Sequence, residues 1–136
     1  MFNCSKTKIL LFLIPVLLAS CWWRSDERYT HASAREAAQR FYTMLVCGDY
    51  GKFVNIQETA DSMTDEYHVQ MVELMEQFMD RFTAERGKVL KVTATRDSLI
   101  EADSTALVWL DLLFADSLVE QICVPLVFTN EKWRMK

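Results

Sequence analysis

The stretch TALVWLDLLF, residues 105–114, decides the fold, because apolar side chains fill one set of alternate positions and mixed side chains fill the other. Side chains of a strand point alternately to the two faces of a sheet, so this pattern predicts a strand with one buried face. Residues 88–96 and 118–128 alternate similarly, and residues 132–135 can form a short last strand. The polar gaps between these runs are short, which predicts antiparallel hairpins.

Helical periodicity precedes the strands. Ser33, with a glutamate three residues later, has the pattern of a capping box and predicts the start of a first helix that Gly48 ends. Asp49 can cap a short second helix, and residues 65–86 carry an apolar stripe at steps of three and four. Helices first and strands last predict an α+β domain over residues 33–136, with three helices packed against a curved antiparallel sheet of about four strands.

The longest predicted helix, residues 65–86, is expected to form the centre around which the sheet curls. Its methionines Met71, Met75 and Met79 could form an adaptable binding groove, although a core stripe packed on the sheet is the favoured interpretation. Trp133 follows a tight turn and is expected to be buried against the same helix. The predicted inward-facing set of the sheet is Val92, Ala106, Val108, Leu110, Val124, Leu126 and Trp133.

The N-terminus follows a different pattern. Lys6 and Lys8 precede an apolar run, residues 9–18, and small residues follow it in LLASC, residues 17–21. This order predicts a secretory signal peptide over residues 1–20. The run is about ten residues long, whereas a helix that crosses the bilayer needs about 20. An uncleaved anchor and a plain secretory signal are the alternatives.

The segment LLASC resembles the lipobox of bacterial lipoproteins, in which the cysteine is acylated and becomes the mature N-terminus. The resemblance implies lipidation of Cys21, with palmitate-type chains, and a lipid anchor in the bacterial cell envelope, at the outer membrane. Several acyl chains satisfy the energetic need for stable anchoring. Residues 21–32 are then a tether, whose tryptophans lie either at the membrane interface or in an exposed linker. Residues 24–27 loosely resemble an acidic signal for export to the cell surface in Bacteroidetes, so the orientation of the anchor stays open.

The charge of the chain excludes one class of binding partner. The formal net charge of the chain is −4, and loss of the two signal-peptide lysines makes the mature part more acidic. Nucleic acid is therefore not an expected partner, because phosphate binding requires a basic patch.

Cys47 and Cys123 remain outside the signal and the lipobox. An exported protein could join them in a disulfide, but burial of both as small apolar residues is the favoured interpretation.

A family resemblance rests on the order of four segments: residues 41–50 with the turn Gly-Asp-Tyr, residues 106–108, residues 124–127 and residues 132–135. Over residues 33–136 the chain resembles small exported lipoproteins of Bacteroidetes with a domain of unknown function in the nuclear-transport-factor-2-like (cystatin-like) superfamily. The resemblance implies a cone-shaped sheet filled by a helix and open at one end, and it implies no established activity. Asn130-Glu131 replaces the glycine turn usual in that family, so the type of the last turn stays open.

No catalytic residue, cofactor or metal site is expected. His68 has no second histidine or cysteine at ligand spacing. Asp111 is the one candidate general base, because enzymes of this superfamily place a carboxylate in the cone. Alternation nevertheless puts Asp111 on the exposed face with Trp109 and Leu113. The sequence contains no nucleophile elbow or phosphate-binding loop.

The expected function is therefore that of a membrane-anchored envelope lipoprotein with a non-catalytic binding or assembly domain. Its partner would be the membrane, through the lipidated N-terminus, together with an unknown protein or a small apolar ligand. The alternatives are a small cone-pocket enzyme of the same superfamily, acting on a small apolar molecule, and a structural spacer. A deep pocket that holds Asp111 would favour the enzyme, whereas a filled cone would favour binding.

Overall fold

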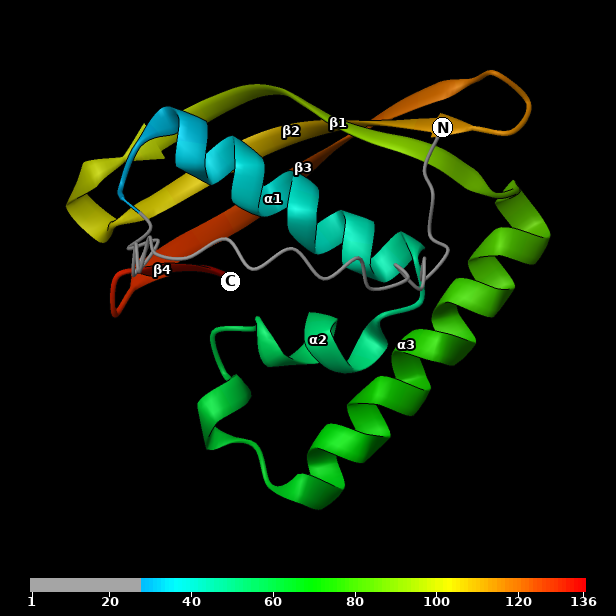
Figure 1. Ribbon diagram of the computed structural model, residues 1–136, viewed down its shortest axis with the longest axis horizontal. Coiled ribbons are helices and arrows are strands. Elements are labelled where there is room, and N and C mark those ends of the chain that lie inside the picture. The colour runs from blue at the N-terminus through cyan, green and yellow to red at the C-terminus, as the bar shows by residue number, and fades with distance from the viewer. Residues whose placement is uncertain (1–27) are drawn as a thin grey trace, which may run out of the picture.

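The computed structural model describes residues 28–136. The predicted signal peptide, the predicted lipidation site Cys21 and most of the predicted tether lie outside the described residues. The predicted α+β class is confirmed, with helices first and strands last (Figure 1). The elements are α1 (His31–Val46), α2 (Tyr50–Asn55), the short 3-10 helix η1 (Ala60–Ser62), α3 (Asp65–Arg86), β1 (Val89–Ile100), η2 (Glu101–Asp103), β2 (Thr105–Phe114), β3 (Val119–Thr129) and β4 (Lys132–Met135).

The four strands form one antiparallel sheet in the order β1-β2-β3-β4. Val108 pairs with Val124 and Leu110 pairs with Ile122, so the alternation of β2 and β3 places apolar side chains on the same face. Every member of the predicted inward-facing set, from Val92 to Trp133, is buried. Register irregularities in β1 bend and twist the strand.

Helix α1 lies along the inner face of the sheet and fills the place that the sequence assigned to α3 (Figure 1). Ala34, Ala37 and Ala38 are buried, and their small side chains let the helix backbone approach the strands closely. The N-cap is Thr30, three residues before the predicted Ser33, which instead forms the other half of the capping box. Tyr29 also packs against the core, so ordered packing begins within the segment interpreted as a tether.

The prediction that the sheet curls around α3 is wrong. Met79 is the one buried residue of this helix, while Tyr67, Leu74 and Phe78 remain 49%, 52% and 53% exposed. Figure 1 shows α3 running beside α2 and approaching the sheet only near its C-terminal end. An apolar stripe identifies the face that a helix tends to bury but not its partner. The alanine-rich α1 can approach the sheet more closely, and it occupies the inner face.

Trp133 is buried as predicted, with 2% of its surface exposed, but its neighbours differ from the expectation. Its indole Nε1 donates a hydrogen bond to Ser33 Oγ at 2.8 Å. Its ring stacks on Tyr29 at a centroid distance of 5.3 Å and meets the edge of Phe128 at 5.1 Å. Trp133 therefore packs at the start of α1 and not against α3.

The two cysteines of the domain do not bond to each other. Cys123 is an exposed free thiol, because its partner across the sheet is Trp109 and both belong to the outward-facing set. The expected burial of Cys123 is therefore wrong. Cys47 is half-buried at the C-terminal end of α1. Within residues 28–136, no helix combines the length and hydrophobicity needed to span a bilayer.

Candidate functional site

An apolar pocket of about 220 Å³ opens between α1, α3 and the end of the sheet, and we call it the α1–α3 pocket. Hydrocarbon, aromatic and thioether groups make up most of its wall. Its ionisable groups are the phenol of Tyr42 and the carboxylate of Glu120. The lining residues are Tyr42, Leu45, Val46, Phe78, Met79, Phe82, Val89, Leu112, Glu120 and Ile122.

Arg86 holds Glu120 at the wall of this pocket and ties α3 to the sheet. Its Nε donates to Glu120 Oε1 at 2.5 Å, and its Cζ lies 3.8 Å from the centroid of the Phe114 ring. Its Nη1 donates to Asp116 at 3.1 Å. The hydrogen bond to Glu120 is the main cause that raises the pKa of Arg86. The Glu120 carboxylate is therefore engaged in an ion pair at the position where it meets the pocket.

The pKa of Asp116 is lowered, mainly by the hydrogen bond from the Leu118 amide and further by Arg86. A lowered folded-state pKa contributes stability above the unfolded pKa, and this contribution is lost as the pH falls through the folded value. The attachment of α3 to the β2–β3 turn is therefore strongest at neutral pH. The pKa of Tyr42 shifts in the opposite direction, because burial raises the pKa of its phenol. At neutral pH this phenol is a neutral hydroxyl.

A strip of apolar side chains on α3 continues the pocket surface outward. We define the α3 strip as Tyr67, Met71, Leu74 and Phe78, which are spaced four, three and four residues apart and so lie on one side of the helix. Three of them are about half exposed, and Met71 is partly buried. Phe78 belongs to both the strip and the pocket wall, and its ring stacks on Phe82 at 6.0 Å. Strip and pocket thus form one continuous apolar surface.

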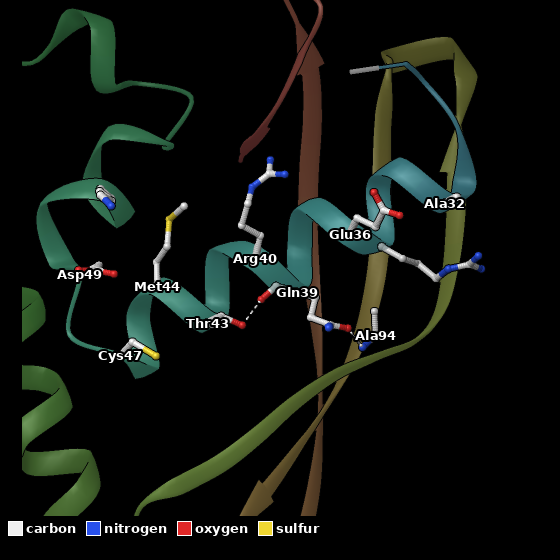
Figure 2. A pocket seen from close by; sticks show the side chains of 11 residues that line it. Ala32, Glu36, Gln39, Arg40, Thr43, Met44, Cys47, Asp49 and Ala94 are labelled. Carbon is white, nitrogen blue, oxygen red and sulfur yellow. Dashed lines mark hydrogen bonds between the residues drawn. The ribbon is translucent and has the colours of Figure 1, made fainter. Parts of the chain in front are cut away.

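A second hollow, of about 580 Å³, follows the outer side of α1, and we call it the α1 groove (Figure 2). The Gln39 side chain crosses to β1, where its Oε1 accepts a hydrogen bond from the Ala94 amide at 3.0 Å. Arg35 donates to Asp97 at 2.9 Å, and Asp97, whose side chain is only 4% exposed, also contacts His31. The lining residues are Ala32, Arg35, Glu36, Gln39, Arg40, Thr43, Met44, Cys47, Asp49, Lys52 and Ala94.

The residues weighed for chemistry from the sequence lie outside both hollows. Asp111 points to the outer face of the sheet, where its Oδ1 accepts a hydrogen bond from Gln121 Nε2 at 3.0 Å. His68 is half-buried, and its Nε2 lies 2.8 Å from Asn55 Oδ1, so it connects α3 to α2. Neither residue lines the α1–α3 pocket.

Sequence reasoning missed the pocket, because its wall combines positions from Tyr42 to Ile122 that meet only in the folded chain. It identified the α3 stripe but interpreted it as core. The spacing of Met71, Met75 and Met79 was the available signal for an adaptable surface. Only Met79 is buried in the structure.

Comparison with known proteins supports the fold. No family model and no curated protein matches the chain. A similar solved structure is that of a putative NTF2-like transpeptidase from Campylobacter jejuni, which is 15% identical and superposes with a TM-score of 0.59. The match covers 75% of this chain and 95% of that one, and at this identity it shows the fold alone. The described part of the chain therefore has a nuclear-transport-factor-2-like fold.

Proposed function

We propose that this chain is a membrane-anchored lipoprotein of the bacterial cell envelope, held at the outer membrane through Cys21, whose domain binds an apolar partner without catalysis. The observation that carries the binding function is the continuous apolar surface of the α3 strip and the α1–α3 pocket. Large contiguous apolar patches are rare on soluble proteins unless they bind something. The anchor rests on the lipobox pattern of the sequence.

The chemistry of the pocket favours binding over the enzyme alternative. A general base has to be available to take a proton from a bound substrate. In the pocket the one carboxylate, Glu120, is already paired with Arg86. The phenol of Tyr42 is protonated at neutral pH, and burial raises its pKa further above the ordinary value. Asp111, the one carboxylate that the sequence offered as a candidate general base, lies on the opposite face of the sheet.

The size of the pocket defines what it can hold. Pockets for drug-sized molecules usually measure about 300–1,000 Å³, whereas this one measures about 220 Å³. It therefore suits one large apolar side chain or a short hydrocarbon group. The α3 strip extends from the pocket over about 16 Å of helix, at 1.5 Å per residue. Together they suit an apolar protein segment that inserts one side chain in the pocket, with a small apolar ligand as the simpler occupant.

Phe78→Asp is expected to weaken binding of a neutral apolar dye, N-phenyl-1-naphthylamine, about tenfold. The substitution replaces the residue shared by strip and pocket with a charge, and the loss of about half the burial of a phenylalanine corresponds to roughly tenfold in affinity. Fluorescence titration of the purified lipoprotein measures the dissociation constant.

Val69→Asp is the matched control, because Val69 is also exposed, at 56%, on the same helix but outside the strip. It should leave dye binding unchanged. Equal affinities of the two variants, or the absence of dye binding to the parent protein, would contradict the assignment of the binding surface.

A further inference from the structure

We propose that the partner of the α3 strip is a basic amphipathic helix of another protein, which lies along the strip and inserts one large apolar side chain in the α1–α3 pocket. This inference rests on the proposed function, because it names the partner of the same apolar surface. The length of the strip, the hollow at each of its ends and the charge beside it support this partner.

The α3 strip runs from one hollow to another. At Phe78 it joins the α1–α3 pocket. At Tyr67 it meets a second, open hollow of about 510 Å³, which we call the Tyr67 hollow. The two residues are eleven positions apart, which is about 16 Å of helix at 1.5 Å per residue. The residues that line the Tyr67 hollow are Thr59, Ser62, Met63, Thr64 and Tyr67.

The shape of this surface favours a helix over an extended strand as the partner. An added strand needs free backbone groups at the edge of a sheet, whereas the backbone groups of α3 bond within the helix. The side chains of the strip form a ridge at steps of four, three and four residues, and such ridges pack in the grooves of a second helix. A partner with apolar side chains at the same spacing would place its first and last anchors in the two hollows.

A polar row runs beside the strip on its solvent side and carries negative charge. Each of its members precedes a residue of the strip by one position, and all of them are exposed. The row contains two carboxylates, two amides and no cation. Its members are Glu66, Gln70, Glu73 and Gln77. The opposite side of the strip turns toward the core, at Met79 and Phe82, so this row is the flank that a partner meets.

The charged groups at the C-terminal end of α3 do not reverse this sign. Arg81 and Glu85 follow the strip, four residues apart on the same side of the helix and opposite in charge. The guanidinium of Arg86 is already held by the carboxylates of Glu120 and Asp116.

The side of α3 that faces α2 adds negative charge. Burial raises the pKa of Tyr50 in α2, and the carboxylates of Asp80 and Glu76 raise it further. Lys52, the one cation of α2, lines the α1 groove instead. Lys88 lies beyond the end of α3, where its carbonyl accepts a hydrogen bond from the turn between β2 and β3. The strip therefore lies in a negative environment.

This charge distinguishes among the possible occupants of the strip. Two copies of the chain that met strip to strip would bring Glu66 and Glu73 of both copies together, and like charges repel. The phosphates of an anionic membrane would be repelled in the same way. A helix with lysine or arginine beside its apolar face instead gains attraction and faster association from the same carboxylates.

Two designed peptides that bind to the full-length lipoprotein, purified in a zwitterionic detergent, test the proposal. Both have about 18 residues, enough to form a helix, and carry leucines at the spacing of the strip with a benzoylphenylalanine as the last anchor. One has lysines on its polar face and the other has glutamates at the same positions. By fluorescence anisotropy, the lysine peptide should bind about tenfold more tightly. Its cross-links, mapped by mass spectrometry, should fall in residues 42–46 and 78–82.

Reversal of the row, by Glu66→Lys together with Glu73→Lys, should weaken the lysine peptide about tenfold and strengthen the glutamate peptide. Glu73→Lys alone, which leaves the first turn of α3 unchanged, should weaken the lysine peptide about threefold. The matched control is Glu101→Lys together with Asp103→Lys in η2, which changes the net charge equally. It should leave both affinities nearly unchanged.

The outcomes separate this partner from the proposed function. Equal affinities of the two peptides, or equal effects of the two double variants, would overturn the basic partner. Binding of the neutral dye, with its loss in Phe78→Asp, would then leave the proposed function standing, whereas absence of dye binding would refute both. Cross-links of the lysine peptide away from the strip and the pocket would overturn the partner, as would a parent protein that forms dimers which Phe78→Asp dissociates.

Discussion

Trp133→Ala is expected to lower the free energy of unfolding by about 3–5 kcal/mol, the usual range for truncation of a buried tryptophan. The ring is 98% buried between Tyr29 and Phe128, and its Nε1 bonds to Ser33. Small domains are stable by only about 5–15 kcal/mol, so the variant should be largely unfolded at growth temperature. Chemical denaturation followed by circular dichroism measures the loss.

Two control variants separate the contributions of Trp133. Trp133→Phe keeps most of the apolar ring but loses the hydrogen bond to Ser33, so a smaller loss, which includes about 1 kcal/mol for the hydrogen bond, is expected. Trp109→Ala removes a half-buried ring on the outer face, where Arg96 lies 4.1 Å from its centroid, and should cost less than Trp133→Ala. An unfolding free energy that is unchanged in Trp133→Ala would show that the start of α1 is not packed as described.

Cys21→Ala is expected to abolish lipidation and to release the protein from the membrane or leave its signal peptide uncleaved. Each buried methylene of an acyl chain contributes about 0.8 kcal/mol to membrane binding, so loss of the acyl chains removes nearly all of the anchoring energy. Detergent phase partition and the intact mass of the protein measure the outcome.

Cys123→Ala is the matched control for the anchor, because it removes an exposed thiol of the domain and should leave partition unchanged. A Cys21→Ala protein that is still shortened to the mature length and still enters the detergent phase completely would refute the anchor.

The strands could be predicted from the sequence because successive residues of the segment 105–114 point to opposite faces of the sheet, and their polarity shows which face is buried. Ala106, Val108 and Leu110 are buried and Asp111 points outward, as alternation requires. The type of the last turn could not be predicted, because Asn130-Glu131 lacks a glycine. Both residues have positive φ, 51° and 62°, as in the turns that match the twist of a two-residue hairpin.

The partner of each helix could not be predicted, because periodicity defines a face of a helix and not what covers it. The long apolar stripe of α3 predicts a core helix, yet the short side chains of Ala34, Ala37 and Ala38 allow α1 to pack more closely on the sheet. The candidate site exists because α1, and not α3, covers the inner face of the sheet. Since α1 occupies the inner face, the strip from Tyr67 to Phe78 stays uncovered and borders the pocket.

The central claim, that the anchored domain binds through the α3 strip and the α1–α3 pocket, is tested most directly by photo-cross-linking in living cells. A benzoylphenylalanine at Leu74, in the strip, is compared with one at Val69; the two side chains are 52% and 56% exposed. We predict a discrete adduct at position 74 that is absent at position 69 and disappears when Phe78→Asp is added. Equal adducts at both positions, or no adduct at position 74, would contradict the claim.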